Sequence, residues 1–372
     1  AEQRRSGKAN PFIILIMDIR YDCWHFKGTM PCHPHKEHGV ECNMECKYYD
    51  ATYGNVLIIK LGAMGDVIRT TPLLVRIKKE YPNKRIFWLT QFSAVLPNLV
   101  DQLLTFSTEN LTYLRSLSFD IGINLDKEPE ACALLDQLEI EKKFGFGLNQ
   151  GMPAPINEYA EHKFLTGISD TYSKANTQHY LEEIFAVCNW KYDGEEYVLP
   201  EKKNIAIIDS IDHSKPIIGL NTGCGVRWTS RQWPIDHWKD LAKILFDEGL
   251  NVIMLGGKSE DEQNRYIAEE SGVKYLGFFP FNEFISLVDK CAVIVSTVTM
   301  AMHVAIGLKK PLVLLNNIFN PHEFHFFSES MILGPDKECE CYYRPTCINE
   351  ISCIADVKAD MVFDAINKLQ QK

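Results

Sequence analysis

The sequence predicts an α/β protein built from two doubly wound halves behind a short segment rich in Cys and His. The first observation is a continuous apolar run at residues 55–61, which ends in a glycine-containing turn and precedes a helical pattern. A second run of this kind, at residues 216–221, also ends in a glycine-containing turn. Strand and helix patterns alternate after both turns, which is typical of buried parallel sheets with crossover helices.

The first half is expected to contain four strands and two helices. The strands are predicted at residues 55–61, 85–90, 119–124 and 143–147, and the helices at residues 66–80 and 177–188. Apolar β-rich runs favour the strands, and apolar spacing of three and four favours the helices. The polar stretch at residues 192–204 is the predicted linker between the halves.

The second half has a more regular pattern. Strands are predicted at residues 216–221, 251–255, 292–296 and 311–315, and helices at residues 235–247, 259–271, 281–290, 299–308 and 357–369. Gly249 follows the first of these helices, where a glycine commonly ends a helix.

The composition is that of an ordinary globular protein. The chain has 372 residues, of which 46% are hydrophobic and 24% charged. Its 39 Lys and Arg against 49 Asp and Glu give a net charge of −10, which disfavours general nucleic-acid binding. Apolar runs such as residues 12–17 fall short of the ~20 residues that a membrane-spanning helix needs. No small-residue cleavage site follows the charged start, so we expect no signal peptide.

Eight of the twelve cysteines form two clusters near the ends of the chain. The clusters are Cys23, Cys32, Cys42 and Cys46, with four interspersed histidines, and Cys339, Cys341, Cys347 and Cys353. Four thiolates with short spacers suit tetrahedral zinc or iron, and a protein without an export signal keeps its thiols reduced. We therefore predict a structural metal at one or both clusters, with unpaired or redox-labile thiols as the alternative.

The turn after the first strand contains Gly62, Gly65 and Asp66. Glycines at the end of a parallel strand allow a tight turn and a close approach to a ligand. Asp66 falls in the first turn of the next helix, at the edge of the sheet where ligands bind in open α/β folds. From the spacing alone, a carboxylate here also suits a helix cap. The spacing matches neither a dinucleotide fingerprint nor a P-loop.

Residues 59–67, Ile-Lys-Leu-Gly-Ala-Met-Gly-Asp-Val, closely resemble the opening motif of glycosyltransferase family 9, the ADP-heptose lipopolysaccharide heptosyltransferases. Residues 230–234, Ser-Arg-Gln-Trp-Pro, are similar to the family's Lys-x-Trp-Pro segment. Residues 255–257 with Glu260 resemble its glycine-rich strand end, and Met302-His303 resembles part of its Met-His-Leu-Ala helix. The resemblance extends over residues 54–372, with the motifs in the family's order.

The resemblance implies the GT-B fold, in which two Rossmann-like domains face each other across a cleft. We expect a Cys/His-rich segment at residues 1–53, an acceptor domain at residues 54–198 and a nucleotide-sugar domain at residues 199–372. The implied chemistry is inverting, metal-independent sugar transfer, which needs a base for the acceptor hydroxyl and donors for the departing diphosphate. The family's base maps to Asp66.

The resemblance also implies the residues that bind the donor, an ADP-heptose-like nucleotide-diphospho-sugar. They are Lys60, Gly65, Thr222, Gly223, Arg231, Glu260, Thr299, Met302 and His303. Arg231 stands where the family has a phosphate-binding Lys and keeps its charge. Thr299 opens a helix whose N-terminus suits an anion. A surface Arg231, a capping Glu260 and a packed His303 are the structural alternatives.

Two positions depart from the family pattern. The family's Asp-Thr-Gly-x-Met-His becomes Val298-Thr299-Met300-Ala301-Met302-His303, which removes an acid near the donor and replaces a glycine by Met300. These changes affect the expected sugar and nucleotide.

The resemblance also concerns the C-terminal cysteine cluster. Many family members have a Cys-rich tail, and a branch that modifies autotransporter proteins holds iron with four cysteines.

The resulting prediction is a cytoplasmic transferase, peripheral to the inner membrane, that acts on a lipopolysaccharide core or another cell-surface glycan. The alternatives are a protein O-glycosyltransferase and a non-catalytic relative that binds nucleotide sugars or senses redox state.

Overall fold

The computed structural model describes residues 18–207, 211–212, 214–225, 227–337 and 339–371. The apolar run at residues 12–17 and the signal-peptide prediction lie outside these residues. Contacts divide the chain after Gly54 into two compact units, which are described separately.

The unit that ends at Gly54 has little regular structure. Its helix α1 (His33–His38) has a proline in its first turn and ends at Gly39, whose φ of 65° lies in the left-handed region. A single bridge joins Cys23 to Ala51. Among the described residues of this unit, only Cys23 and Pro34 are buried, so it has almost no hydrophobic core.

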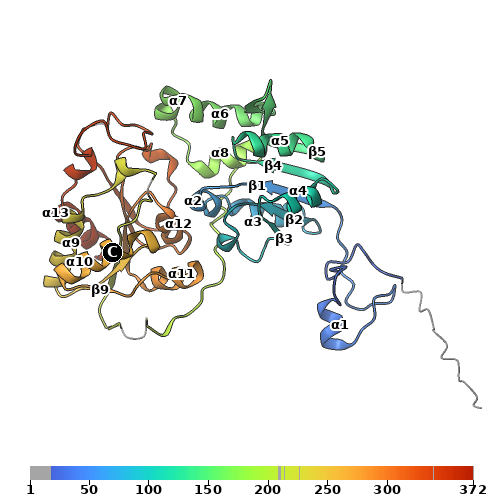
Figure 1. Cartoon of the computed structure of the whole chain (residues 1–372), viewed down its shortest axis with the longest axis horizontal. Helices are drawn as coiled ribbons and strands as arrows, with labels where there is room; N and C mark the ends of the chain where they lie inside the picture. Colours follow the sequence, from blue (N-terminus) through green and yellow to red (C-terminus); the bar gives the residue numbers. More distant parts are fainter. Residues whose placement is uncertain (1–17, 208–210, 213, 226, 338, 372) are drawn as a thin grey trace, which may run out of the picture. The chain divides into compact units, whose positions relative to one another are not determined.

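The first sheet of the larger unit has six strands in the order β3-β2-β1-β4-β5-β6 (Figure 1). They are β1 (Asn55–Ile59), β2 (Arg85–Leu89), β3 (Gln102–Leu104), β4 (Ser118–Asn124), β5 (Glu139–Asn149) and β6 (Met152–Pro155). The helices are α2 (Met64–Ile68), α3 (Pro72–Glu80), α4 (Thr108–Leu114), α5 (Pro129–Gln137), α6 (Glu161–Ile168), α7 (Asp170–Ala175) and α8 (Tyr180–Val187). All neighbouring strands are parallel except β5 and β6.

The second sheet also has six strands, all parallel, in the order β12-β11-β10-β7-β8-β9. They are β7 (Ile217–Asn221), β8 (Asn251–Leu255), β9 (Lys274–Tyr275), β10 (Val293–Thr297), β11 (Leu312–Leu315) and β12 (Ser330–Leu333). The helices are α9 (Ile235–Asp247), α10 (Asp261–Ser271), α11 (Phe281–Lys290), α12 (Met300–Gly307) and α13 (Ala359–Gln370). The apolar central strands β7 and β10 are buried along their whole length, as expected for strands covered on both faces.

Each sheet reverses its strand order at one point, and such points are where open α/β sheets bind ligands. The reversal lies between β1 and β4 in the first sheet and between β7 and β10 in the second. The turns after β1 and β7 are the two glycine-containing turns singled out in the sequence. Helix α2 follows β1 of the first sheet, α12 follows β10 of the second sheet, and the two helices pack against each other. The points where the two sheets reverse their strand order therefore face each other.

The predicted GT-B architecture of two Rossmann-like domains is confirmed. The predicted helix at residues 66–80 is interrupted, because Pro72 begins a new helix, α3, after α2 ends at Ile68. The helices α1 and α4 to α7 and the strands β3, β6, β9 and β12 were missed. The predicted division at 198/199 lies between α8 and β7 and stays a prediction.

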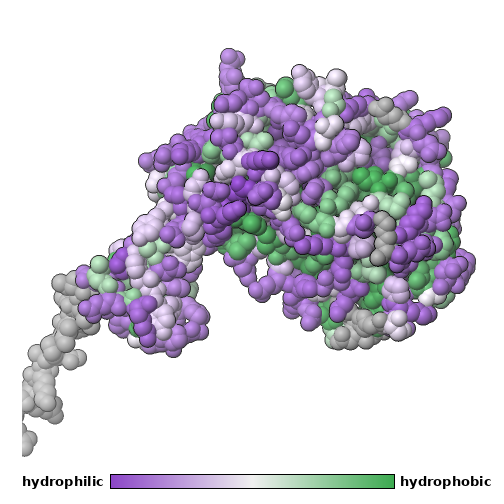
Figure 2. Space-filling model, turned by 180° about the vertical axis from the view of Figure 1, so that it is seen from behind, coloured by the Kyte–Doolittle hydropathy of each residue, from purple (hydrophilic) through white to green (hydrophobic). Residues whose placement is uncertain are grey.

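Among the described residues, no helix is both long enough and apolar enough to cross a membrane. The face in Figure 2 is mostly hydrophilic, with hydrophobic side chains gathered in one area of the larger unit.

Gly145 in β5 pairs with Asn124 of β4 and has a φ of +95°. A Cβ at this position would lie 1.8 Å from the carbonyl oxygen of Asn124. We expect Gly145→Ala to lower the free energy of unfolding by about 3 kcal/mol, because backbone strain and steric overlap add. Gly151→Ala is the matched control: its φ is +81°, but no atom lies within 4 Å of the added Cβ. Equal losses of stability in urea unfolding would contradict the steric account.

Candidate functional site

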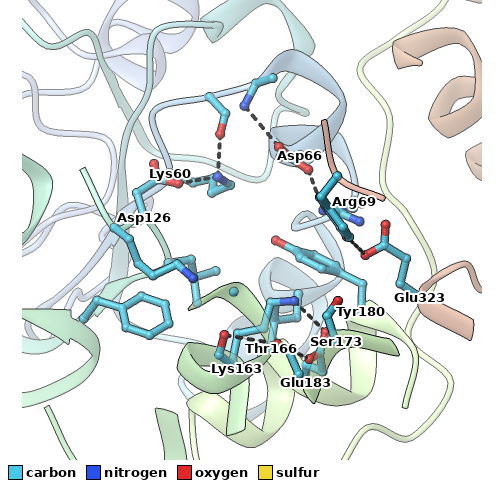
Figure 3. Close-up of a pocket in the computed structure, with 18 of the residues that line it drawn as sticks. Lys60, Asp66, Arg69, Asp126, Lys163, Thr166, Ser173, Tyr180, Glu183 and Glu323 are labelled. Carbon is cyan, nitrogen blue, oxygen red and sulfur yellow. Dashed lines mark hydrogen bonds and ion pairs between the residues drawn. The ribbon is translucent and has the colours of Figure 1, made fainter. Parts of the chain in front are cut away.

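Asp66 lies in α2, directly after the turn that follows β1. One carboxylate oxygen is 2.7 Å from the Arg69 guanidinium, and the other accepts a hydrogen bond of 3.3 Å from the Ala63 amide (Figure 3). The Asp66 side chain is 34% exposed and lines a cavity. It therefore caps its own helix weakly while it also faces open space, so the capping role and a role in chemistry are compatible.

The cavity has a volume of about 800 Å³ and lies between the two α/β domains. We call it the interdomain cavity; the first domain contributes Lys60, Asp66, Asp126 and Lys163 to its wall, and the second contributes Arg227 and Glu323. Figure 3 shows Lys60 and Asp126 on one side, Asp66, Arg69 and Glu323 on another, and Lys163 and Glu183 across from them.

The pKa of Asp66 is set by opposing effects. Burial alone would raise it, but the positive charges of Arg69 and Lys60 outweigh burial and lower the pKa to about 2. Asp66 in turn raises the pKa of Arg69 against the effect of burial. Arg69 also stacks on the Tyr180 ring, with 3.6 Å between its guanidinium carbon and the ring centroid. Asp66 is therefore ionised and oriented at neutral pH.

Lys60 is almost completely buried and is engaged within its own domain. Its ammonium forms an ion pair with Asp126 and a hydrogen bond with the Gly62 carbonyl, and Asp126 also accepts from the Leu61 amide. Through these contacts, Lys60 joins the turn after β1 to Asp126, which follows β4. The structure gives this predicted donor-binding residue a structural role, although it does line the cavity.

Gly65 lies where α2 meets α12. A Cβ on Gly65 would be 2.6 Å from the ring of His303 and 3.6 Å from the Cα atom of Met300. The His303 side chain is buried, and its Nδ1 has no hydrogen-bond partner among the described residues. Burial lowers the pKa of His303 to about 3, and the charge of Arg69 adds to this effect. The imidazole is therefore neutral at pH 7.

Arg231 comes from the second domain and is near Asp66 and His303. Asp66 raises the pKa of Arg231 and Arg231 lowers that of His303, although burial dominates and lowers the pKa of Arg231 overall. One guanidinium nitrogen donates to the Cys224 carbonyl over 2.9 Å, whereas the buried Nε has no partner among the described residues. Arg231 is thus a half-buried cation with a free donor, and not the surface arginine of the alternative reading.

Thr222, Gly223 and Glu260 form a second group at the ends of β7 and β8. The Thr222 hydroxyl hydrogen-bonds to Asn264 over 2.5 Å, and a Cβ on Gly223 would lie 2.9 Å from the Glu260 carboxyl carbon. Glu260 accepts from the Gly257 amide over 2.9 Å, which is the capping role weighed in the sequence. Cys224 follows Gly223 in the chain and its carbonyl accepts from Arg231, so it connects this group to Arg231.

Thr299 and Met302 have different surroundings. Thr299 is the N-cap of α12, and its hydroxyl accepts a hydrogen bond of 3.2 Å from the Asn221 side chain. Met302 is completely buried in the hydrophobic core. Its side chain therefore packs in the core and does not line the interdomain cavity.

The two cysteine clusters do not form metal sites in the structure. Cys23, Cys32, Cys42 and Cys46 line one mostly apolar cavity of about 340 Å³. In the tail, Cys339 and Cys353 are 3.0 Å apart and Cys341 and Cys347 are 3.3 Å apart, measured between sulfur atoms. Throughout the described ranges, no group of three or more His, Cys, Asp or Glu side chains is placed to hold a metal ion. The predicted zinc or iron is therefore not shown.

Sequence reasoning missed Arg69, Asp126, Tyr180 and Glu323, which all line the interdomain cavity. Two signals were present. Arg69 lies three residues after Asp66, on the same face of the helix. Asp126 lies two residues after β4, the strand that pairs with β1. Asp66 and Asp126 therefore both follow the ends of neighbouring strands. Tyr180 and Glu323 depend on distant packing and had no local signal.

Comparison with known proteins gives a consistent result. The family model of glycosyltransferase family 9 (heptosyltransferase) matches residues 111–347, which begins after the Asp66 motif. Lipopolysaccharide heptosyltransferase 2 of Escherichia coli K12 is 29% identical over 119 residues, covering 30% of this chain and 34% of that protein. The matched part thus spans about a third of this curated relative.

Solved structures share the fold. The family 9 glycosyl transferase from Veillonella parvula superposes with a TM-score of 0.65 at 17% identity, covering 86% of this chain and 98% of that one. The E. coli heptosyltransferase WaaC, solved with ADP, gives a TM-score of 0.59 at 16% identity, covering 85% and 99%. The family match, which extends over more than half of the residues, shows that this chain belongs to glycosyltransferase family 9.

Proposed function

We propose that the protein is an inverting glycosyltransferase that moves a heptose-like sugar from an ADP-heptose-like donor to a lipopolysaccharide core or a related glycan. The observation that supports this best is the meeting of Asp66 from the first domain with Arg231 and His303 from the second. A carboxylate base from one domain and a cation from the other thus lie close enough for the charge of Asp66 to raise the pKa of Arg231. The acceptor would be met at the cytoplasmic face of the inner membrane.

The donor's diphosphate fits the unpartnered nitrogens of this region. The buried Nε of Arg231, a donor, and the buried Nδ1 of His303, which donates in one of the two tautomers of the neutral ring, have no hydrogen-bond partner among the described residues, and buried polar atoms are rarely left unpaired. The N-terminus of α12, which begins after Thr299, adds a positive dipole. The ADP bound by the related E. coli enzyme supports a nucleoside diphosphate.

The proposed transfer is a single displacement. Asp66 accepts the proton of the acceptor hydroxyl while that oxygen attacks the anomeric carbon, and the bond from this carbon to the diphosphate breaks. Arg231 stabilises the negative charge on the leaving diphosphate. A carboxylate with a pKa of about 2 is a weak base, so the proton moves only as the new carbon–oxygen bond forms. The proposed step needs no metal, because side chains supply both the base and the cation.

Asp66→Asn tests the base. We expect turnover to fall at least 1,000-fold, because the amide cannot take the proton, while ADP binding by calorimetry stays within threefold of wild type. Asp136→Asn, on α5 and outside the cavity, is the control. An Asp66 variant with unchanged turnover would instead favour a non-catalytic sugar-binding protein.

Arg231→Gln tests the diphosphate contact. Loss of a charged hydrogen-bond donor is expected to weaken ADP binding by about 10- to 100-fold. The affinity for adenosine, which lacks phosphate, should change little. Arg265→Gln serves as the control, because Arg265 is exposed and pairs with Asp261. Equal weakening for ADP and adenosine would place Arg231 away from the phosphates.

Arg69→Met tests the electrostatic setting of the base. In the wild type the lowered pKa keeps Asp66 ionised, so base protonation should not reduce kcat/KM as the pH falls from 8 to 5. Without Arg69, Lys60 still lowers the pKa of Asp66 but opposes burial less completely, so the pKa rises and kcat/KM should begin to fall at a higher pH than in the wild type. An unchanged pH profile in the variant would show that Arg69 does not set the charge of Asp66.

A further inference from the structure

The second-domain wall of the interdomain cavity holds a carboxylate to which the proposed transfer step gives no role. Glu323 ends the short 3₁₀ helix Pro321–Glu323, which follows β11, and its side chain lines the cavity. The Tyr343 hydroxyl donates to one of its oxygens over 2.8 Å. The other oxygen has no hydrogen bond or ion pair among the described residues, and it is not one of the enclosed atoms without a partner. Glu323 thus offers one accessible, anionic acceptor to a ligand.

The cations around Glu323 are paired with other carboxylates. Arg69 pairs with Asp66 at 2.7 Å, and Lys163 pairs with Glu183 at 2.6 Å. Burial raises the pKa of Glu323, Arg69 and Lys163 oppose this effect, and Glu183 adds to it. In the view of Figure 3, Arg69 lies between Asp66 and Glu323. The free oxygen of Glu323 is therefore near positive charge but has no direct contact with it.

The loop that carries Glu323 is fixed against the first domain. The buried Asn320 side chain donates to the carbonyls of Ser173, over 2.6 Å, and Asn176, over 2.8 Å. Its own carbonyl oxygen accepts from the His322 amide over 3.0 Å, so both ends of the side chain are used. Glu323 is therefore held in place before a ligand arrives, which lowers the entropic cost of binding.

Aromatic rings connect Glu323 to the cation that we propose for the diphosphate. Tyr343 packs edge-to-face on Phe319 with 5.0 Å between ring centroids, and Phe319 packs on Trp228 at 5.7 Å. The guanidinium carbon of Arg231 lies 5.6 Å from the centroid of the Phe319 ring and 5.9 Å from that of Trp228. Trp228 and Tyr343 both line the cavity. A group bound at Arg231 and a group bound at Glu323 would thus be neighbours along one aromatic wall.

We infer that Glu323 binds hydroxyl groups of the sugar that is transferred and is therefore a specificity-determining residue for the donor. This inference rests on the proposed function, because it places the diphosphate at Arg231 and the attacked carbon between Arg231 and Asp66. The sugar next to the diphosphate then lies along Trp228 and Tyr343, whose rings suit its apolar faces. An ionised carboxylate only accepts hydrogen bonds, and a neutral sugar supplies hydroxyl donors.

The test measures what the sugar adds to donor binding. ADP-heptose and ADP-glucose are each compared with ADP by calorimetry on the full chain, without an acceptor, so that no transfer takes place. We expect the wild type to bind at least one ADP-sugar about 10-fold more tightly than ADP, because Glu323 adds charge-assisted hydrogen bonds. The sugar that gives the larger gain is the preferred one.

Glu323→Leu should remove this gain, while the affinity for ADP stays within about threefold of wild type because the two contacts are separate. Near-normal ADP binding also shows that the variant is folded. Glu323→Gln keeps an acceptor oxygen without its charge and should retain part of the gain. Tyr343→Phe keeps the carboxylate but removes the contact that orients it, so the gain should fall without disappearing.

Glu329→Gln is the matched control, because Glu329 is exposed and does not line the cavity. It should keep the full gain. A wild type for which neither sugar adds affinity, or a gain that survives in Glu323→Leu, would overturn the inference.

Failure of this inference is distinguishable from failure of the proposed function. Asp66→Asn should lose turnover but keep the gain from the sugar, because the base acts on the acceptor hydroxyl. Glu323→Gln should keep ADP binding and raise KM for the ADP-sugar more than it lowers kcat. If Asp66→Asn leaves turnover unchanged, the catalytic proposal fails whatever the sugar adds. If ADP does not bind, the proposed diphosphate site fails and this inference fails with it.

Discussion

The close packing of α2 on α12 is the constraint on which the candidate site depends. A Cβ on Gly65 would overlap the His303 ring at 2.6 Å, so only glycine lets these helices approach to this distance. This close packing places Asp66, the next residue, opposite the second domain. Its negative charge is near enough to Arg231 to raise the pKa of that side chain. The proposed base, Asp66, comes from the first domain, and the cation Arg231 comes from the second. The proposed chemistry therefore takes place where the two domains meet. Gly65 determines how closely α2 and α12 approach each other there.

The electrostatics follow a consistent division. In the first domain, Asp66, Asp126 and Glu183 each have a cationic partner from the same domain, which fixes their positions. In the second domain, Arg231 has a carbonyl partner but no ion pair among the described residues. Unpaired cations are costly to bury, so they are expected where a ligand supplies the missing charge. The arrangement separates residues that hold the cavity together from those that remain available to a substrate.

The sequence predicted the parts of the fold that depend on local pattern. The helices α9 and α11 have the predicted bounds, because their apolar spacing is strong and each begins after a proline. The predicted helix at 66–80 was broken because the stop at Pro72 was overlooked within an apolar run. The helices α6 and α7 were missed because the short, mostly polar segment around them has no clear period.

The site was less predictable than the fold, for a related reason. Asp66 and Arg231 were found through their motifs, and the spacing of those motifs is a local property. The partners that tune them, such as Tyr180 and Glu323, lie far away in the sequence and are brought in by tertiary packing alone. The cysteine clusters show the opposite case. Their spacing favoured a metal, but spacing does not fix whether four sulfurs surround one point, and in the tail they meet in two pairs.

The departures at positions 298 and 300 can now be interpreted physically. Val298 packs against the hydrophobic core, so the missing acid is replaced by a side chain that the second domain can accommodate. Met300 faces Gly65 with its Cα atom, at 3.6 Å from the position of an added Cβ. The contact therefore involves the backbone at 300, so the Met300 side chain is compatible with the close packing of α2 on α12. The requirement for glycine lies at position 65, on the other helix. What the replacement changes is charge, because an apolar side chain that packs against the core stands where the family pattern has a carboxylate.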